Sequence, residues 1–543
     1  MKYFLKLFDL IIVAGTIFYL SLFITDYSFV FAHGISNITG PSFGLAILLF
    51  LRYALAKDSF KDIFLVRRLI FIDAGFNRRL LAWGIPLTFI TFSALSIARH
   101  LSLSSGSFDL GLFDQAIWNT LNGDTLFCSI RNNMNLLGDH FEPILLLIVP
   151  IYKIFPSVYV LLFLQSALLA SGLLPLYLIA KDKIKQPALI TVFLLSYMLS
   201  RPLRGVAYSD FHLEAFILPL LFWAYYFLAR RRNLLLWAAV ALLLLTKEDT
   251  AFLVSGLGIF AFFAQKRAKM GVSLFFIGFL AWFLETKFII PYFNPNGVFE
   301  HLNKLPFGEN YQENLKNILK NPLMPVKFIF IKEKLMYCVK LFGPLGFTSI
   351  LSPAHYILIG IPLVKNLLAD PYFSGYYNIT SHYTAQVLPF IYISAIYGVC
   401  RLVGLIKYSK FPNLLAVFII LCSLSFYGKT DAYKFNRFLK TIKEENTLRK
   451  ISYLTIVPDN ASVAASFNLV PHLSHRKHIY QWNPQNESSL EVEYLVIDLS
   501  LIEYLSKDDI ASIPGYFNKI REIGYSKIFE SEDGDFLIFR KEK

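Results

Sequence analysis

The side chains best suited to chemistry begin with two carboxylates in one polar stretch. Asp109 and Asp114 lie five residues apart in GSFDLGLFDQAIWNTLNG, where apolar residues recur at helical spacing from Leu110 onward. The pattern predicts a short amphipathic helix with Asp109 at its start and Asp114 on another face. A carboxylate there can deprotonate an acceptor hydroxyl or help hold a metal, so Asp109 is the first candidate general base and Asp114 the second. The competing interpretation is that Asp109 only caps the helix.

Two further sites combine a carboxylate with an imidazole. Asp139 and His140 are adjacent in LLGDHFEP, and Asp210 precedes His212 by two residues in YSDFHLEAF. Such pairs ligate divalent cations or polarise a phosphate, and they also occur as structural hydrogen-bond pairs. Two similar sets in one chain favour the functional interpretation.

A charged triplet, KED at 247–249, follows the apolar run LLLLT. Three adjacent charges at the end of an apolar segment are costly unless they are used or paired. Lys247 is therefore a candidate ligand for a phosphate, with Glu248 orienting it. The alternative is a cap whose charges neutralise each other.

These residues need membrane helices to position them. The chain has 543 residues, 55% hydrophobic and 16% aromatic, with a mean hydropathy of +0.51. A soluble protein could not cover so much apolar surface, and the repeated apolar runs of about 17–25 residues can cross a bilayer. Basic loops alternate with loops that carry acids and histidines. Because basic loops stay cytoplasmic, the acid and histidine clusters should share the outer face.

The remaining composition excludes other classes of protein. Much of the formal charge of +14 lies in the basic loops, so we interpret it as orientation and contact with anionic lipid. No nucleic-acid reader motif accompanies the charge. The four cysteines show neither a disulfide framework nor thiolate metal spacing.

The apolar runs predict a mainly helical bundle of about 13 spans in a plasma (inner) membrane, with the N-terminus cytoplasmic and the C-terminus outside. The assignment depends on PILLLIVPIYKIFP, residues 143–156, which three prolines interrupt. We interpret this segment as re-entrant or interfacial. If it crossed the bilayer, Asp109 and Asp210 would face opposite compartments.

Three parts follow along the chain. Residues 1–79 should form two additional transmembrane helices and a basic cytoplasmic loop, and residues 80–427 the transmembrane core with its outer loops. Residues 428–543 have more charges and short β-type runs, SVAAS, EYLVIDL and FLIFR, which predict a small extracytoplasmic α/β domain. This part has no glycine-rich phosphate loop, so we do not expect it to bind a nucleotide.

Further cations lie on the expected outer side. Arg201 and Arg204 flank Pro202 and depart from the charge rule, which makes them candidates to bind an anionic group. His382, in SHYTAQ, is a weaker candidate of the same kind.

The motifs FDLGLFDQAIWNTLNG, NLLGDHFEPILLLIVPIY, SDFH, LLTKED and ASVAASFNLVPHLSHRKHIYQW together resemble a family of bacterial and archaeal polytopic membrane proteins of unknown function. That family in turn looks like a branch of the GT-C superfamily of membrane glycosyltransferases. The resemblance covers roughly Leu80 to the C-terminus, so the first two spans look like an addition.

The resemblance implies transfer of a sugar from a polyprenyl-phosphate donor to an outer glycan, lipid or protein acceptor. GT-C enzymes place a catalytic acid in the first outer loop, which Asp109 matches by position, and Asp210 would match the acid of the next outer loop. Many members carry a compact acidic pair, whereas here the two first-loop acids are five residues apart. Metal dependence varies among GT-C groups, so use of Mg²⁺ or Mn²⁺ stays open.

Under this scheme cations among Arg201, Arg204 and Lys247 hold the donor phosphate while Asp109 takes the acceptor proton. Two alternatives stay open: a transporter or flippase for a lipid-linked or anionic solute, and a non-catalytic assembly protein. A transporter should carry ionisable residues near the bilayer midplane. Most candidates here lie at span ends or in outer loops, which favours interfacial chemistry.

Overall fold

The computed structural model describes residues 72–302, 305–309, 311–427, 445–485, 491–500 and 507–542. The two spans predicted near the N-terminus, most of the basic loop after them and the predicted boundary at residue 428 lie outside the described residues. The first described helix, α5 (Ala74–Leu101), starts before its apolar run. Asp73 caps it by accepting a hydrogen bond from the Phe76 amide at 2.6 Å, so the basic residues before position 80 already belong to the helix.

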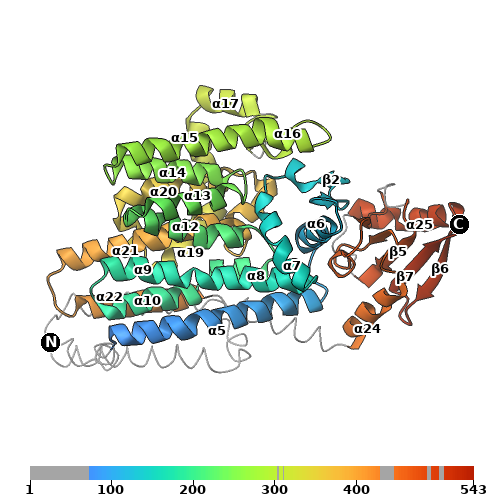
Figure 1. Cartoon of the computed structure of the whole chain (residues 1–543), viewed down its shortest axis with the longest axis horizontal. Helices are drawn as coiled ribbons and strands as arrows, with labels where there is room; N and C mark the ends of the chain where they lie inside the picture. The colour runs from blue at the N-terminus through green and yellow to red at the C-terminus, as the bar shows by residue number, and fades with distance from the viewer. Residues whose placement is uncertain are drawn as a thin grey trace.

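Helices dominate the described residues between positions 72 and 427 (Figure 1). Five segments are long and apolar enough to cross a membrane: α5, Val158–Lys183, Pro187–Tyr208, Ala268–Phe293 and Leu388–Leu405. Within these segments the helices are α8 (Val158–Ser171), α9 (Leu173–Lys183), α10 (Pro187–Met198), α11 (Arg201–Tyr208), α15 (Ala268–Leu284), η5 (Glu285–Ile289), α16 (Ile290–Phe293) and α21 (Leu388–Leu405).

Shorter helices complete this part of the chain. The apolar ones include α12 (Glu214–Ala229), α13 (Asn233–Leu244), α14 (Thr250–Phe263), α20 (Tyr356–Leu368) and α22 (Phe411–Ser425). Three others lie between α16 and α20: α17 (Tyr311–Lys320), α18 (Leu323–Ile329) and α19 (Lys332–Phe342). A helix of 12 residues reaches about 18 Å, less than the ~30 Å of a hydrocarbon core. The total of about 13 spans therefore stays a prediction.

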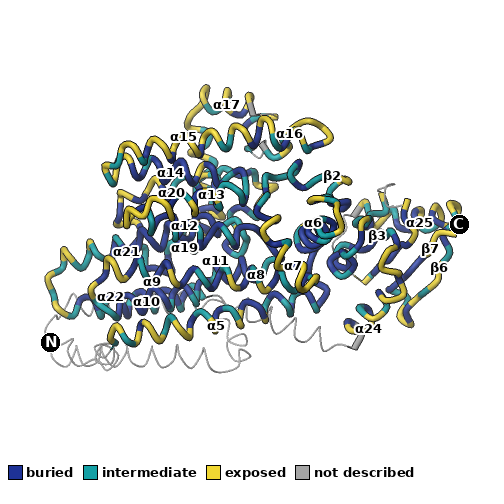
Figure 2. Tube along the Cα trace, in the orientation of Figure 1, coloured by how far each residue is buried: buried dark blue, intermediate teal, exposed yellow. Residues whose placement is uncertain are grey.

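The helices enclose one apolar core and present apolar side chains outward as well. Phe193, Phe222 and Tyr392 are buried in this core, whereas Phe276 and Leu280 of α15 are 61% and 53% exposed. Exposed positions recur along α15 (Figure 2). A helix that is apolar all round suits contact with protein on one side and with lipid on the other.

The proline-broken segment forms two short helices, η4 (Pro143–Leu147) and α7 (Val149–Ile154). Its twelve residues would reach about 18 Å as an α-helix, too little to cross a bilayer. Leu147, Ile151 and Ile154 are exposed along it, whereas Tyr152 is buried. The length and the two faces support the interpretation of an interfacial element.

The C-terminal part contains a five-stranded mixed sheet with the order β4-β3-β5-β7-β6. Strand β3 pairs in parallel with β4 and β5, and β7 pairs antiparallel with β5 and β6. The runs SVAAS, EYLVIDL and FLIFR supply three of the strands. The elements are α24 (Glu445–Tyr453), β3 (Val463–Ala465), β4 (Ile479–Gln481), β5 (Tyr494–Asp498), α25 (Lys507–Glu522), β6 (Tyr525–Glu530) and β7 (Phe536–Lys541).

This sheet packs against the first predicted outer loop at one end of the bundle (Figure 1). The loop contains η2 (Ser107–Gly111), α6 (Leu112–Leu121), η3 (Leu136–Gly138) and the two-stranded ribbon of β1 (Phe127–Cys128) and β2 (Met134–Asn135). Leu110 and Ile117 share a buried apolar cluster with Val463 and Ile479. Ser107 Oγ also donates to Gln481 Oε1 at 2.6 Å, so loop and sheet form one packed unit.

Candidate functional site

Asp109 lies on a π-helix, which is a different local structure from the predicted helix start. The π-helix η2 runs directly into α6, and the residue at its N-terminal cap position is Gly106. The Gly106 amide donates to the carboxylate of Asp210 at 2.7 Å. The alternative in which Asp109 only caps the helix is therefore wrong. Single-turn π-helices often occur at functional sites, because the extra residue redirects side chains.

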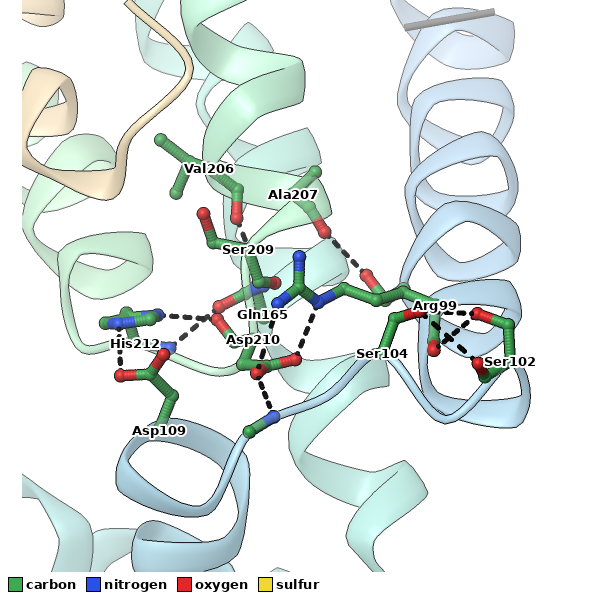
Figure 3. A network of polar contacts seen from close by, with 12 residues as sticks. Arg99, Ser102, Ser104, Asp109, Gln165, Val206, Ala207, Ser209, Asp210 and His212 are labelled. Atoms are coloured by element: carbon green, nitrogen blue, oxygen red, sulfur yellow. Dashed lines mark hydrogen bonds and ion pairs between the residues drawn. The ribbon is translucent and has the colours of Figure 1, made fainter. Parts of the chain in front are cut away.

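The Asp109 carboxylate pairs with the imidazole of His212 (Figure 3). Oδ1 of Asp109 lies 3.1 Å from Nε2 of His212, and Nδ1 of His212 lies 2.6 Å from the carbonyl oxygen of Asp210. Both ring nitrogens face an acceptor, which favours the imidazolium. Burial lowers the pKa of His212, but the charge of Asp109 outweighs it and raises the pKa to about 9.

Asp109 itself is ionised and reachable. Burial raises its pKa, and the charge and hydrogen bond of His212 more than reverse this effect, so the pKa falls to about 2. Its side chain is 43% exposed, against 9% for His212. The site thus offers an open carboxylate that a buried cation holds in place.

His382, from a distant part of the chain, also contacts His212. Its ring stacks on that of His212 with centroids 3.8 Å apart. Burial, with the positive charge of His212, lowers the pKa of His382 to about 3, so its ring is neutral. Gly205 permits the approach, because a Cβ at this position would lie 2.4 Å from the Cα of Thr380.

Asp210 connects the elements that carry the site. Its carboxylate accepts from Arg99 Nε at 3.0 Å and from the Gly106 amide, and its side chain is 1% exposed (Figure 3). The carboxylate therefore joins the end of α5 to the start of η2. Gln165 of α8 fixes the same turn, accepting from the His212 amide at 2.9 Å and donating to the Ser209 carbonyl at 3.1 Å.

Lys247 lies in the same network through Glu214. Its Nζ is 3.2 Å from Oε1 of Glu214, the first residue of α12, and its side chain is 13% exposed. Burial lowers the pKa of Lys247, but Glu214 and Asp249 raise it well above the ordinary value. Glu214 also interacts electrostatically with His212 and His382. Carboxylates and cations thus alternate from Asp109 to Lys247.

Glu248 orients a histidine and is not bonded to Lys247 as the sequence suggested. Its Oε1 lies 2.8 Å from Nδ1 of His140, and its Oε2 accepts from the Phe141 amide at 3.1 Å. Asp139 contacts His301 Nε2 at 2.7 Å and Arg131 at 2.8 Å. Asp139, His140 and His301 together could hold a metal ion, since one ligand atom from each lies within 4.8 Å of the others.

The two predicted phosphate-binding arginines lie on α11. Arg204 is buried with its guanidinium 3.5 Å from the ring centroid of Tyr427, and it donates to the carbonyls of Leu199 and Tyr427. These contacts join α11 to the end of α22. Arg201 is the first residue of α11, about two and a half turns before Asp210.

Asp114 faces away from Asp109 and is fully enclosed. Its carboxylate accepts from Tyr152 Oη and from Ser474 Oγ at 2.5 Å, and it lies 3.0 Å from Nε2 of His475. The charge of Asp114 outweighs burial and raises the pKa of His475. Asp114 thus links the first loop to α7 and to the C-terminal part.

A family model described as "Predicted membrane protein (DUF2079)" matches residues 99–534. The chain belongs to the DUF2079 family. This confirms the prediction of a polytopic membrane protein family of unknown function. No curated protein matches the sequence.

Solved structures similar to this DUF2079 protein include ArnT from Cupriavidus metallidurans, in the apo state and bound to undecaprenyl phosphate. Each is 14% identical over 84% of this chain and 98% of the ArnT chain, with TM-scores of 0.45 and 0.46.

The contacts of this DUF2079 protein bring four separate predicted clusters to one side of the bundle. Asp109, His212 and His382 are in contact, Lys247 joins them through Glu214, and the Asp210 carboxylate lies beside them. Sequence reasoning missed Arg99, Gln165 and His301. Only Arg99 carried a signal, since a cation at the expected outer end of a span departs from the charge rule.

Proposed function

We propose that this DUF2079 protein is a membrane glycosyltransferase that moves a sugar from a polyprenyl-phosphate donor to an acceptor outside the cytoplasm. The observation that carries the proposal is the Asp109 carboxylate, open to solvent yet fixed by His212 at the ends of apolar helices. Phe108 beside it is 48% exposed, which places the carboxylate next to an apolar surface. A lipid-linked substrate needs such a boundary between lipid and water.

Asp109 acts as the base in this reaction. The acceptor oxygen attacks the anomeric carbon, the bond from that carbon to the phosphate oxygen breaks, and polyprenyl phosphate leaves with the bonding electrons. The hydroxyl proton becomes acidic as the new bond forms, so an ionised carboxylate of low pKa takes it late in the step. A single displacement of this kind inverts the anomeric centre.

His212 and Lys247 are the cations that favour a leaving phosphate. Both are charged; Asp109 itself holds His212, and Glu214 holds Lys247. The buried contacts of Asp210 support a positioning role in place of the predicted catalytic one. Arg204, bonded to the end of α22, fits a structural role for the same reason.

The placement of the charges favours this proposal over a transporter. His212 and Lys247 lie in connections between helices, and Asp109 and His382 lie in the short helices η2 and η11. None of the four lies inside one of the long apolar helices. A transport pathway would put such groups near the middle of the membrane.

The test offers purified protein in lipid nanodiscs a panel of polyprenyl-phosphate sugars together with a panel of glycan, lipid and protein acceptors, and it measures the released polyprenyl phosphate by mass spectrometry. We expect Asp109→Asn to lower the rate about 10²–10⁴-fold, the usual contribution of a general base. Asp182→Asn is the matched control, because Asp182 lies at the end of α9 and pairs with Arg230 at 2.9 Å among the predicted basic clusters.

Equal release by wild type and Asp109→Asn would overturn the role of Asp109. Movement of labelled lipid between leaflets without any release would support the transporter instead.

A further inference from the structure

A second polar cluster contacts Glu248, the middle residue of the KED triplet, and contains side chains of the types that bind metal ions. Asp139, His140 and His301 each offer one ligand atom, and these atoms lie within 4.8 Å of one another. The two imidazoles stack with centroids 4.2 Å apart and planes at 10°. Ligands of one zinc ion lie about 3.4 Å apart, so small side-chain movements would bring the three atoms together.

Metal-binding histidines usually donate a hydrogen bond from their second ring nitrogen to a carboxylate, and Glu248 is such a carboxylate for His140. Its Oε1 lies 2.8 Å from Nδ1 of His140, which leaves Nε2 as the nitrogen for a metal. The second oxygen of Glu248 is fixed by the Phe141 amide, so the carboxylate cannot rotate freely. A carboxylate on the far nitrogen sets the tautomer and raises the basicity of the ligand.

The carboxylate ligand is supported as well. Arg131 Nη2 donates to Oδ1 of Asp139 at 2.8 Å and lies 3.8 Å from Glu300. Ligating carboxylates are ordinarily hydrogen-bonded in this way. The Arg131 contact therefore orients Asp139 and still leaves its other oxygen for an ion.

Backbone packing holds the two ligand-bearing loops together. Gly138 packs against the end of α16, where a Cβ would lie 2.5 Å from the carbonyl oxygen of Phe293. Asn294 Nδ2 donates to the Gly138 carbonyl at 2.9 Å. The loop with Asp139 and His140 is thus joined to the segment that leads to His301, although the chain between them is more than 150 residues long.

We propose that Asp139, His140 and His301 bind one divalent ion of the zinc class, with Glu248 as the positioning residue. Two imidazoles and one carboxylate favour zinc or cobalt over Mg²⁺, which prefers oxygen ligands. Three protein ligands leave a fourth position for water, as in open zinc sites. The ion would join the loop after α16, which carries His301, to the first loop, which carries Asp139 and His140. This junction lies beside Glu248, the neighbour of Lys247 in the chain.

The experiment counts metal on the full chain and needs no transfer activity, so this proposal and the proposed function fail separately. Purified protein in detergent is equilibrated with ZnCl₂, desalted and analysed by mass spectrometry for zinc per chain. We expect about one zinc in wild type and background levels in His301→Asn. Glu248→Gln should keep the ion but weaken its affinity about 10–100-fold in a chelator competition.

His478→Asn is the matched control, since His478 lies in the C-terminal part outside the cluster, and it should retain the zinc of wild type. Substitution of wild type with Co²⁺ gives an independent reading, because a four-coordinate site absorbs strongly in the visible range. Absence of zinc and cobalt from wild type, binding of Mg²⁺ alone, or full zinc in His301→Asn would each overturn the proposal.

Discussion

The pair formed by Asp109 and His212 should make stability depend on pH in a defined window. Folding raises the pKa of His212 from 6.5 to about 9, which corresponds to about 3 kcal/mol. Asp109 is 43% exposed, so solvent screens the pair, and we expect about 1–3 kcal/mol. Because the folded pKa is raised, this stabilisation is complete below about pH 6.5 and is lost as the pH rises through about 9.

The free energy of unfolding is measured by titration with SDS in mixed micelles, from pH 6 to pH 10, for wild type and for His212→Gln. Glutamine keeps a hydrogen-bond donor but cannot carry the proton. Wild type should lose about 1–3 kcal/mol more than His212→Gln between about pH 6.5 and 9. His478→Gln is the control, since burial lowers the pKa of His478 below 6.5, where this window begins. Parallel curves for wild type and His212→Gln would refute the assignment of a charged His212.

Two further changes test how the site is positioned. Asp114→Ala removes the acceptor of two buried hydroxyls and of the half-buried His475, and it should cost about 3 kcal/mol in the same unfolding assay. Asp124→Ala breaks an exposed ion pair and should cost about 0–1 kcal/mol, and equal losses would contradict the enclosed geometry. Gly205→Ala should cost about 1–3 kcal/mol and lower transfer, because its Cβ would collide with the backbone that leads to η11 (His382–Gln386). Gly404→Ala, in open space on α21, should do neither, and a harmless Gly205→Ala would show that this close approach does not matter.

The sequence was most informative about which residue types gather at helix ends. Apolar runs and charge alternation predicted that Asp109, His212 and Lys247 share a side, because hydropathy and loop charge are local properties of the chain. The side-chain contacts among these residues agree. Which compartment that side faces stays a prediction.

The partner of each charge could not be predicted. Glu248 was expected to orient its neighbour Lys247, but it contacts His140, 108 residues away. Asp210 meets Arg99 across 111 residues, and Asp114 meets Ser474 across 360. Such pairings depend on how separate loops fold over one another, and no periodicity along the chain encodes them. The π-helix under Asp109 was missed for a related reason, since the contact of Gly106 with Asp210 helps define its start.

The apolar cluster between the first loop and the sheet also limits how this protein can be divided. A chain shortened to the bundle would keep every apolar helix, yet Leu110 and Ile117 would meet water, and the carboxylate of Asp114 would lose two of its three partners. Replacing the sheet with that of a distant relative would disrupt the same interface, because the side chains of the loop and of the sheet pack against one another. The acid-bearing loop and the sheet are therefore expected to be exchanged, repaired or engineered only as a pair.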